Sequence, residues 1–360
     1  MRRVAFYAPM KSPHHPVPSG DREMARNLMV AIAATGRARV DLVSDLCTRD
    51  KQGDVTVQRQ LRARADTEAQ RLIRDLPTDT GMWVTYHNYY KVPDLIGPVV
   101  ARTRNLPYVQ IEASRAKRRL TGPWAGFAQA AEDACDAADL IFYLTRHDLL
   151  TLERDRAPGQ RLAHLPPFLP VDTLPQAQAS GAHLLTVAMM RDGDKLASYQ
   201  LLAQALTHLQ APDWRLDIVG DGPAKAQVRA LMAPFGDHVH FLGQLGRDDL
   251  HAAYADAGVF VWPGVNEGFG MVYLEAQSFG LPVVAQDRPG VRDVVLPGGH
   301  PLPEAGAQAM ARRIDTLLQD ATLRQRTGAQ AREMIARCHL RPSASATFWS
   351  AVTPVLESRP

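Results

Sequence analysis

The stretch of sequence that decides the fold runs from Val259 to Val284 and reads VFVWPGVNEGFGMVYLEAQSFGLPVV. Its two apolar ends predict short β-strands, and the segment between them predicts a glycine-bearing loop followed by a helix. A strand, a helix and a second strand in this order form the crossover unit of a parallel sheet. The stretch therefore predicts an α/β domain.

The same alternation of short apolar runs and helical periodicity extends along nearly the whole chain. The candidate strands are 3–7, 40–44, 82–86, 108–111, 140–144, 162–165, 183–188, 215–219, 238–242, 259–262 and 282–285. Helical stretches such as 22–34 and 127–138 lie between them. This pattern is typical of parallel sheets that are covered by helices on both faces.

The length of the chain predicts more than one domain. Its 360 residues exceed the roughly 250–300 at which a single hydrophobic core stops growing. The alternation restarts after a proline-rich segment, 166–172, which continues neither a helix nor a central strand because proline lacks the backbone N–H. We therefore place a first domain at 1–170, a linker at 171–181, a second domain at 182–340 and a terminal helix at 341–360. In open α/β sheets ligands bind outside the carboxyl ends of the strands, so we expect the site in a cleft between the domains.

Composition excludes several classes of protein. Hydrophobic residues make up 46% of the chain and charged residues 22%, which is ordinary for a globular protein. The formal net charge of +3 does not indicate a nucleic-acid partner. Cys47, Cys135 and Cys338 are widely separated and lack metal-ligand spacing, so we expect neither a disulfide framework nor a zinc site. No apolar stretch approaches the ~20 residues of a membrane span. We expect a cytoplasmic protein that is neither exported nor membrane-spanning.

Glycines and glutamates in the deciding stretch predict a phosphate-binding loop. Gly268 and Gly270 let backbone N–H groups approach a ligand at the start of the helix, where unpaired donors and the positive dipole end favour a phosphate. Glu267 precedes the helix and Glu275 lies two turns later, so two carboxylates flank one ligand and accept hydrogen bonds from its hydroxyls. For the bare spacing, the alternative is a pair of exposed glutamates on an amphipathic helix.

Glu267 begins the sequence Glu-Gly-Phe-Gly, and seven residues separate it from Glu275 in the following helix. This pattern resembles the signature of retaining glycosyltransferases of the family-4 type, the glycosyl transferases group 1. Those enzymes have the GT-B fold, an α/β fold of two Rossmann-like domains facing each other across a cleft. The resemblance implies an acceptor-side first domain and a second domain that binds the nucleotide sugar. It implies that Glu267 contacts the transferred sugar and Glu275 the ribose. The backbone expected to bind the sugar and the diphosphate is that of Phe269, Gly270, Met271 and Val272.

Further segments agree with this resemblance in the same order along the chain. Segments 220–223 and 239–243 match parts that in the family help to enclose the nucleotide base. The N-terminal glycine loop of the family falls on Gly20, which we assign to donor binding, but its second glycine is Asp21 here. The helix 343–356 corresponds to the one that in the family crosses back onto the first domain.

Cations for the leaving diphosphate are expected in the loop after the first strand of the second domain. The leaving group gains negative charge in the transition state, so preplaced cations lower the barrier. Lys195 matches the family's lysine, whereas the family's arginine falls on Met189. Arg191, on the same side of an extended chain, is expected to replace it, with a surface charge as the alternative. Segment 192–194 matches the Asp-x-Asp metal pattern of another glycosyltransferase fold, but Asp and Gly also favour turns. We interpret it as a turn and expect no metal or other cofactor.

Two first-domain residues are candidates for substrate contacts. The family's active-site histidine follows a strand, and the matching position here is Glu112. Glu112 either hydrogen-bonds the donor sugar or the acceptor, or it caps the following helix. His87 ends another strand, and the polar, aromatic run 88–91 behind it suits an acceptor because sugars stack on aromatic faces. A structural histidine beside packing aromatics is the alternative.

Together these features predict a retaining glycosyltransferase that moves a hexose-type sugar from a nucleotide diphosphate sugar to a hydroxyl of a lipid or glycan acceptor. The expected catalytic residues are Glu267, Lys195, Arg191 and Glu112. Family frequency favours UDP as the nucleotide. The basic and aromatic stretch 115–127 predicts peripheral contact with an anionic membrane, with a solvated loop as the alternative. Alternatives for the whole chain are a nucleotide-sugar epimerase or phosphorylase of similar fold, and a sugar-nucleotide-binding protein without catalysis.

Overall fold

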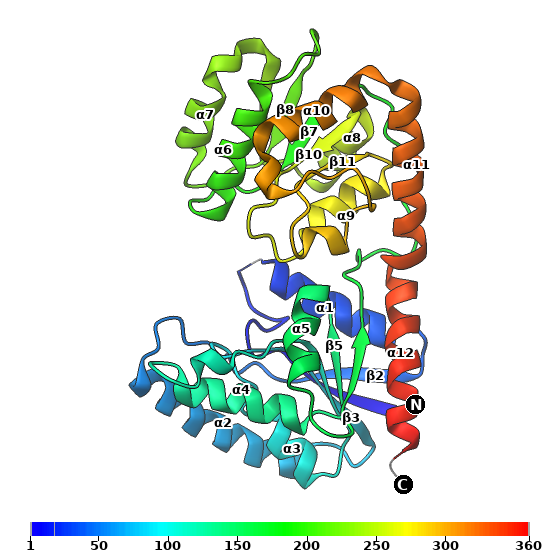
Figure 1. Cartoon of the computed structure of the whole chain (residues 1–360). Coiled ribbons are helices and arrows are strands. Elements are labelled where there is room, and N and C mark those ends of the chain that lie inside the picture. The colour runs from blue at the N-terminus through cyan, green and yellow to red at the C-terminus, as the bar shows by residue number, and fades with distance from the viewer. Residues whose placement is uncertain (1, 18, 359–360) are drawn as a thin grey trace. The chain divides into compact units, whose positions relative to one another are not determined.

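The computed structural model describes residues 2–17 and 19–358 and is shown in Figure 1. The chain divides into two compact units, which we call unit 1 and unit 2. Unit 1 comprises Met1–Pro166 with Arg341–Pro360, and unit 2 comprises Pro167–Leu340. Each unit contains one sheet with helices packed on it, so each is an α/β domain of its own.

The sheet of unit 1 is parallel and has the strand order β2-β1-β3-β4-β5-β6. Its strands are β1 (Arg2–Tyr7), β2 (Ala38–Ser44), β3 (Thr80–Asn88), β4 (Tyr108–Ala113), β5 (Leu140–Tyr143) and β6 (Arg161–His164). The central strand β3 is buried at all but one position, which is typical of a parallel strand covered on both faces. The strand order reverses at β1, between β2 and β3, and in α/β sheets such a switch point is where ligands bind.

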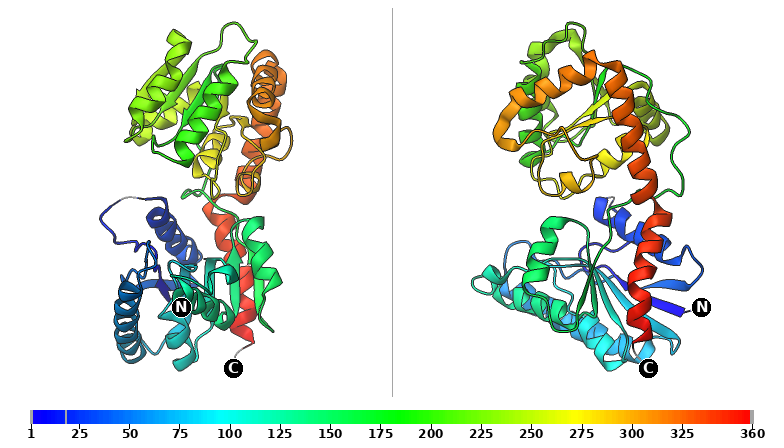
Figure 2. Two further views of the ribbon diagram at one scale, coloured as in Figure 1. Left: turned by 60° about the vertical axis from the view of Figure 1, so that its left-hand side comes forward. Right: turned by 45° about the vertical axis from the view of Figure 1, so that its right-hand side comes forward.

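The helices of unit 1 are α1 (Gly20–Ala33), α2 (Val55–Asp75), α3 (Gly97–Thr103), α4 (Ala125–Ala137), α5 (Arg146–Arg154) and α12 (Arg341–Glu357), with a 3₁₀ turn η1 (Lys117–Arg119). Helices α2, α3 and α4 lie on one side of the sheet and α1 and α12 on the other (Figures 1 and 2). Helix α12 packs against α1, where Trp349 Nε1 donates to the carbonyl oxygen of Ile32 at 3.0 Å. Phe348 stacks on Phe142 of β5 with ring centroids 5.3 Å apart. The last helix of the sequence is thereby part of the core of unit 1.

Unit 2 also has a parallel sheet, with the order β11-β10-β7-β8-β9. Its strands are β7 (Leu184–Val187), β8 (Leu216–Val219), β9 (Val239–Gly243), β10 (Val259–Val261) and β11 (Val283–Val284). Its helices are α6 (Asp194–Leu206), α7 (Lys225–Met232), α8 (Arg247–Asp256), α9 (Met271–Ser278), α10 (Gly306–Gln319) and α11 (Ala321–Cys338), with 3₁₀ turns η2 (Ala233–His238), η3 (Val291–Asp293) and η4 (Pro303–Ala305).

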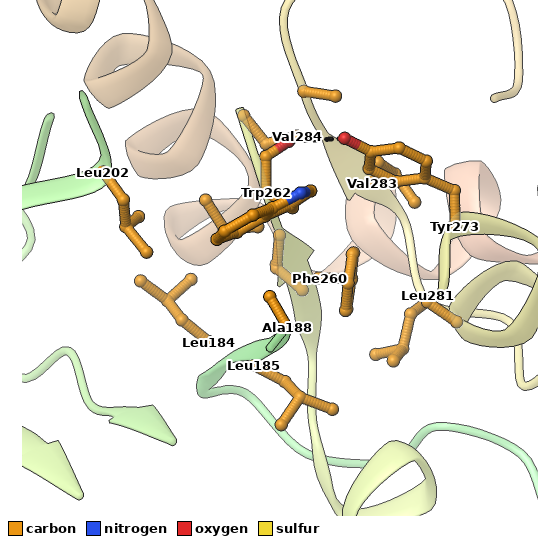
Figure 3. Packing of buried hydrophobic residues seen from close by; sticks show 14 of the residues in the cluster. Leu184, Leu185, Ala188, Leu202, Phe260, Trp262, Tyr273, Leu281, Val283 and Val284 are labelled. Atoms are coloured by element: carbon orange, nitrogen blue, oxygen red, sulfur yellow. Dashed lines mark hydrogen bonds between the residues drawn. The ribbon is translucent and has the colours of Figure 1, made fainter. Parts of the chain in front are cut away.

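Aromatic side chains in the core of unit 2 fix the segment that follows β10. Trp262 and Tyr273 are fully buried, and the Tyr273 hydroxyl donates to the carbonyl oxygen of Trp262 at 3.1 Å (Figure 3). Leu184 of β7 and Phe260 of β10 pack in the same cluster (Figure 3). Replacing a buried tryptophan by alanine typically destabilises a domain by about 3–5 kcal/mol. This packing therefore holds the start of the glycine-bearing loop in one place.

The secondary structure agrees with the sequence-based prediction. Each expected strand is present, and its ends differ from the expected ones by at most two residues. The predicted helices at 22–34, 127–138 and 343–356 correspond to α1, α4 and α12. Within the described residues, every helix is too short or too polar to span a lipid bilayer. The expected cleft between the two units stays a prediction.

The proline-rich segment runs beside the other chain segment that ends unit 2. Leu169 and Leu340 form a parallel bridge, and the Leu169 N–H donates to the carbonyl oxygen of His339 at 2.8 Å. His339 Nδ1 lies 2.7 Å from the carbonyl oxygen of Pro167. The proline-rich segment is thus ordered at Leu169, whose N–H finds a partner in the segment before α12, and the expected linker, 171–181, falls within unit 2.

Candidate functional site

The glycine-bearing loop between β10 and α9 has open space where a ligand is expected. Gly270 precedes α9 with φ 75° and no side chain caps the helix. The Tyr273 N–H donates to the carbonyl oxygen of Gly270 at 3.1 Å, which leaves the N–H groups of Met271 and Val272 without a partner in the helix. Apart from Gly268 and its two chain neighbours, no heavy atom of the described residues lies within 4 Å of the position that a Cβ of Gly268 would occupy. On the opposite side, a Cβ on Gly290 would collide with the carbonyl oxygen of Gly268. Gly290 therefore supports the loop, and Gly268 leaves its outer side free.

Glu267 lies in this loop and forms a compact cluster with a cation and an indole. Its Oε1 accepts a hydrogen bond from Trp262 Nε1 at 3.0 Å and makes an ion pair with Lys195 Nζ. The Lys195 ammonium also lies 5.5 Å from the centroid of the Trp262 ring. The side chains of Lys195 and Glu267 are 24% and 13% exposed. In this state the carboxylate and the ammonium satisfy each other at the edge of the core.

The loop after β7, which leads to Lys195 in the first turn of α6, is held by the glycines of segment 220–223. Gly220 and Gly222 have φ angles of 145° and 151°, and a Cβ on either would collide with a carbonyl oxygen of Ala188 or Met190. The Met190 N–H donates to the carbonyl oxygen of Asp221 at 2.9 Å. The role that the structure shows for this segment is therefore to position the loop after β7.

A pocket of about 280 Å³ brings three of the expected site residues together. It is lined by Arg191, Asp192, Asp194, Lys195, Val265, Asn266 and Glu267. Arg191 is exposed, and within the described part of the chain its guanidinium has no carboxylate partner. Met189 is 53% exposed and Met190 is buried, so Met189 and Arg191 face the same way, as the extended-chain argument expected.

The predicted turn at 192–194 is present. Asp192 and Gly193 form a turn, Gly193 has φ 76°, and α6 begins at Asp194. The two carboxylates have separate partners: Asp192 accepts from Gln227 Nε2 at 3.2 Å, and Asp194 accepts from Asn266 Nδ2 at 2.8 Å. The turn therefore begins α6 and ties it to the glycine-bearing loop.

Glu275 lies in a different and larger pocket. This pocket measures about 790 Å³ and is walled mainly by apolar side chains of α8, α9 and the segment 169–177. The Tyr254 hydroxyl donates to Glu275 Oε2 at 3.0 Å. Burial raises the pKa of Glu275, and the hydrogen bond from Tyr254 offsets only part of this rise. The two glutamates of the signature thus stand in two pockets of unit 2.

The remaining residues expected to bind the donor are placed as follows. Phe269, Met271 and Val272 are partly buried against the core of unit 2. Gly20 is exposed at the start of α1, where the Ser19 hydroxyl accepts from the Arg22 N–H at 3.3 Å. Pro18, in the expected glycine loop, lies outside the described residues.

In unit 1, His87 and Glu112 lie side by side at the carboxyl edge of the sheet. In the register of β3 and β4, Tyr86 pairs with Ile111 and Asn88 with Ala113, so His87 stands next to Glu112. His87 Nδ1 lies 3.7 Å from Glu112 Oε2. His87 Nε2 lies 3.6 Å from Oδ1 of Asp21, in the first turn of α1. The structure therefore adds Asp21 to the two residues expected from the sequence.

The helix-cap alternative for Glu112 is wrong. Glu112 belongs to β4, and the next turn, η1, is preceded by Ala116 without any side-chain cap. Asp21 was noted in the sequence only as a departure from a glycine pattern. Its partnership with His87 joins two segments 66 positions apart, so sequence spacing gave no signal for it.

The basic stretch 115–127 offers less membrane-facing surface than expected. Arg115 is buried and pairs with Glu132 at 2.8 Å and with Asp136 at 2.6 Å, so its expected contact with lipid is wrong. Phe127 is fully buried and equally unable to enter an interface. These two side chains anchor the stretch to α4.

Other cations of this stretch lie at the surface. Lys117 is exposed and pairs with Asp155 at 2.8 Å, and Arg118 is exposed. Arg119 lies over the rings of Tyr90 and Trp124, at 5.0 and 5.8 Å from their centroids. The aromatic run after His87 therefore packs against a cation, as the packing alternative proposed.

Comparison with known sequences places part of the chain in a family. Residues 177–334 match the sequence model of the family described as glycosyl transferases group 1. The chain is 36% identical over 141 residues to the sulfoquinovosyl transferase of Arabidopsis thaliana, covering 38% of this chain and 27% of the plant protein. It is 30% identical over 206 residues to a GDP-mannose-dependent alpha-(1-6)-phosphatidylinositol monomannoside mannosyltransferase of Mycolicibacterium smegmatis, covering 51% of this chain and 54% of that protein.

A solved structure matches the chain along its whole length. Sucrose-phosphate synthase from Thermosynechococcus elongatus is similar with a TM-score of 0.69 and 20% sequence identity, over 99% of this chain and 100% of that chain. By contrast, the chain spans only about a quarter of the plant relative and about half of the bacterial one. Residues 177–334 therefore belong to the glycosyl transferases group 1 family, and the chain has the GT-B fold.

Proposed function

We propose that this protein is a retaining glycosyltransferase that transfers a hexose-type sugar from a nucleoside diphosphate sugar to a hydroxyl group of a glycolipid or glycan. The observation that carries the proposal is the cluster of Lys195, Trp262 and Glu267 beside the uncapped start of α9. It places a cation and a carboxylate in one small pocket, and the unpaired backbone donors stand at the start of the helix that follows Glu267. A phosphate and a sugar need these three kinds of group.

The diphosphate of the donor binds at the start of α9 in this proposal. The N–H groups of Met271 and Val272 point along the helix axis toward an anion, and the helix dipole adds positive potential. Lys195 and Arg191, which share a pocket, supply the charges that stabilise the leaving diphosphate. Arg191 has no carboxylate partner among the described residues, so it reaches a phosphate without breaking an ion pair.

Glu267 changes partners when the donor binds. Its carboxylate now pairs with Lys195, and a diphosphate competes for that ammonium. Once Lys195 turns to the phosphate, Glu267 accepts hydrogen bonds from hydroxyls of the sugar while Trp262 Nε1 still holds its Oε1. The transfer then has a balanced course: the bond from C1 to the phosphate oxygen breaks with its electron pair, and the acceptor oxygen bonds to C1 from the same face. The acceptor proton passes to the departing phosphate oxygen.

The nucleoside occupies the larger pocket in this proposal. Glu275 accepts hydrogen bonds from the ribose hydroxyls, and the apolar wall provided by α8 and segment 169–177 covers the base. The bacterial relative is named for GDP-mannose, whereas family frequency favours UDP. The carboxylate and the apolar wall of this pocket suit the ribose and the base of a nucleoside diphosphate. Calorimetry with different nucleotides is the experiment that identifies the base. Asp192 and Asp194 are already hydrogen-bonded to amides, and we propose that transfer proceeds without a metal or another cofactor.

The experiment that tests the proposal measures nucleotide binding and transfer separately. Isothermal titration calorimetry of the full chain with UDP, GDP and ADP is expected to give one saturable site for one of them. Glu275→Gln is expected to weaken nucleotide binding at that site. Lys195→Ala is expected to weaken the binding of the nucleoside diphosphate more than that of the monophosphate. Transfer from the matching nucleotide sugar is then assayed with and without EDTA. Absence of nucleoside diphosphate binding, or loss of transfer in EDTA, contradicts the corresponding part of the proposal.

We also propose that the acceptor is presented at an anionic membrane surface by the cations of η1. The bacterial relative is named for a phosphatidylinositol acceptor, and Arg118 is exposed beside Arg119. Each cation near an anionic headgroup layer contributes about 1 kcal/mol. Arg118→Ser with Arg119→Ser is expected to reduce sedimentation with vesicles that contain anionic lipid at low salt. A matched loss of charge on α2, Arg59→Ser with Arg74→Ser, is expected to leave it unchanged. Equal sedimentation of both double variants contradicts membrane presentation by η1.

A further inference from the structure

An arginine of α11 joins two parts of the wall of the larger pocket in unit 2. Arg332 Nη1 donates to the carbonyl oxygen of Ser278, at the end of α9, and Nη2 donates to the carbonyl oxygen of Pro175. Ser278 and Pro175 both line this pocket, together with Glu275, whereas Arg332 is not among the residues that line it. The guanidinium therefore stands behind the wall and ties a helix end to the irregular segment 170–178.

Close packing of α11 on α9 brings the guanidinium to this place (Figure 1). A Cβ on Gly328, one turn before Arg332, would collide with the carbonyl oxygen of Gly280. Gly280 follows α9, and the position of a Cβ on it lies 3.9 Å from Cδ of Arg332. Residues four apart on a helix share one face, so the glycine that permits the close approach and the arginine that uses it both face α9.

The last carbonyl groups of α9 show what the guanidinium contributes. A helix leaves its last carbonyl oxygens without partners of its own. Those of residues 276–277 accept from N–H groups that follow the helix. The carbonyl oxygen of Ser278 accepts from Arg332, and that of Phe279 accepts from the Ala179 N–H at 2.7 Å. The end of α9 is thus held by Arg332 and by the chain just beyond segment 170–178.

A second arginine of α11 provides a comparison. Arg324 Nη1 donates to the carbonyl oxygens of Leu317 and Leu318, near the end of α10, at 2.8 and 3.1 Å. Both arginines therefore bind two carbonyl groups, but those bound by Arg324 belong to one helix and lie outside the pocket of Glu275. Burial lowers the pKa of Arg332, and its two hydrogen bonds in the described part of the chain both go to carbonyl oxygens.

Segment 170–178 is held at both ends and at a point between them. The Leu169 N–H donates to the carbonyl oxygen of His339 at one end, and the Ala179 N–H is paired at the other. Between these ends the backbone is bound by Arg332 at Pro175, and Leu174 packs partly buried against the core of unit 2. An irregular segment with few backbone anchors opens at a lower free-energy cost than a helix or a strand. Loss of the bond from Arg332 therefore favours the open segment.

We propose that segment 170–178, which we call the strap, closes over the nucleoside pocket, and that Arg332 is the positioning residue that keeps it closed. The strap and α8 provide the apolar walls, and a planar ring between apolar walls is stabilised by the water it excludes. A pocket that is closed for part of the time binds with a Kd raised by the inverse of that fraction. The inference rests on the proposed function for the identity of the ligand.

The first test needs no nucleotide and follows amide hydrogen exchange of the full chain by mass spectrometry. Arg332→Ala is expected to speed exchange in the strap, because its middle loses a backbone anchor. The matched control, Arg324→Ala, is expected to leave exchange in the strap unchanged. Arg332→Lys keeps the charge and reaches one carbonyl, so it is expected to give an intermediate rate, and it replaces Arg332→Ala if that variant does not fold. Exchange in the strap at the wild-type rate in both variants of Arg332 overturns the proposal.

The second test measures binding by calorimetry with UDP, GDP and ADP. If the strap of Arg332→Ala is closed about one tenth of the time, the Kd of the nucleoside diphosphate rises about tenfold. Arg332→Lys is expected to raise this Kd less, and Arg324→Ala to leave it unchanged. Inorganic pyrophosphate lacks the nucleoside, so its binding is expected to be the same in wild type and Arg332→Ala. Equal Kd values for the nucleoside diphosphate in these two proteins, or an equal loss of pyrophosphate binding, overturn the proposal.

The third test separates positioning of the nucleoside from a role in the reaction. Arg332→Ala is expected to raise KM for the donor about tenfold and to leave kcat unchanged, because the strap contacts the nucleoside rather than the reacting atoms. A lowered kcat with an unchanged KM overturns the proposal.

The outcomes keep this inference apart from the proposed function. If the wild type binds none of the three nucleotides, the proposed function fails, and with it the assignment of the pocket to a nucleoside. If the wild type binds one of them and Arg332→Ala binds it equally well, the strap alone fails and the proposed function stands.

Discussion

In unit 2 the carboxylate of Glu267 is satisfied by Lys195 and Trp262, whereas in unit 1 His87 Nε2 and Glu112 Oε2 have no hydrogen-bond partner among the described residues. Both clusters lie beside the carboxyl ends of parallel strands. The cluster of unit 2 is closed by its own hydrogen bonds and stands in a loop held by glycines. The cluster of unit 1 is open and stands on strained strand ends.

The difference lies in what a ligand has to displace. In the proposed function, a ligand that binds Lys195 has to compete with its ion pair to Glu267, which favours a strongly charged group such as a diphosphate. In unit 1, by contrast, two buried polar atoms have no hydrogen bond among the described residues that a ligand has to displace.

The largest expected effect concerns the closed cluster. Lys195→Ala is expected to lower turnover about 100- to 1000-fold, as removal of one group that stabilises a developing charge typically does. The same change leaves Glu267 partly buried without its cation, which destabilises the fold by about 1–3 kcal/mol. Adding Glu267→Gln is expected to restore stability but not turnover. Initial rates and urea unfolding check both. If Lys195→Ala loses activity only in proportion to the fraction of unfolded protein, Lys195 supports the fold alone and the prediction is contradicted.

The next effect concerns the second pocket of unit 2. Glu275→Gln is expected to weaken the binding of the nucleoside diphosphate by about 1.5–3 kcal/mol, because a hydrogen bond to a charged group is lost. Its raised pKa means that the ionised carboxylate costs stability at neutral pH, a cost that disappears as pH falls below the unfolded value of 4.5. The neutral variant is therefore expected to be at least as stable as the wild type at pH 7. Calorimetry and thermal unfolding at pH 4 and pH 7 test this, and weaker stability at pH 7 with unchanged affinity contradicts it.

A smaller effect follows from the open cluster. The pKa of His87 is raised above 6.5 by its carboxylates, so its favourable contribution is fully present below that value and is lost as pH rises through the raised pKa. Wild-type stability is expected to fall more than that of His87→Asn between pH 6.5 and pH 9. Urea unfolding at several pH values measures the two slopes. Parallel slopes would mean that the imidazole is not held protonated by Glu112 and Asp21.

The smallest effect provides a reference for the ion pair in unit 2. Lys117 is 54% exposed, and its pair with Asp155 resembles an ordinary surface salt bridge. Arg154 and then Lys117 lower the pKa of Asp155 to about 2, so their contribution is present above 3.8 and is lost as pH falls toward 2. Lys117→Ser is expected to cost less than about 1 kcal/mol at pH 7, and this cost is expected to shrink as pH falls through 2. A cost as large as that of Lys195→Ala would show that burial does not distinguish the two pairs.

Much of the fold was predictable because its signals are local. Short apolar runs alternate with helical periodicity, and this pattern gave every strand of both sheets within two residues. That Glu267, Lys195 and Arg191 line one pocket was also expected, since each stands in a short contiguous segment with a recognisable pattern, and their roles in donor binding stay predictions. The family match covers the same part of the chain, 177–334.

Tertiary structure alone decided the rest. Asp21 meets His87 only because α1 and β3 pack together, and the partners that bury Arg115 lie on α4, away from the basic run in which it stands. The sequence by itself determined two parallel α/β domains and a glycine-bearing loop between β10 and α9, because backbone periodicity and glycine placement act over a few residues. Which polar atoms are satisfied and which remain open depends on contacts between residues far apart in sequence, and on the burial that makes an unpaired atom costly.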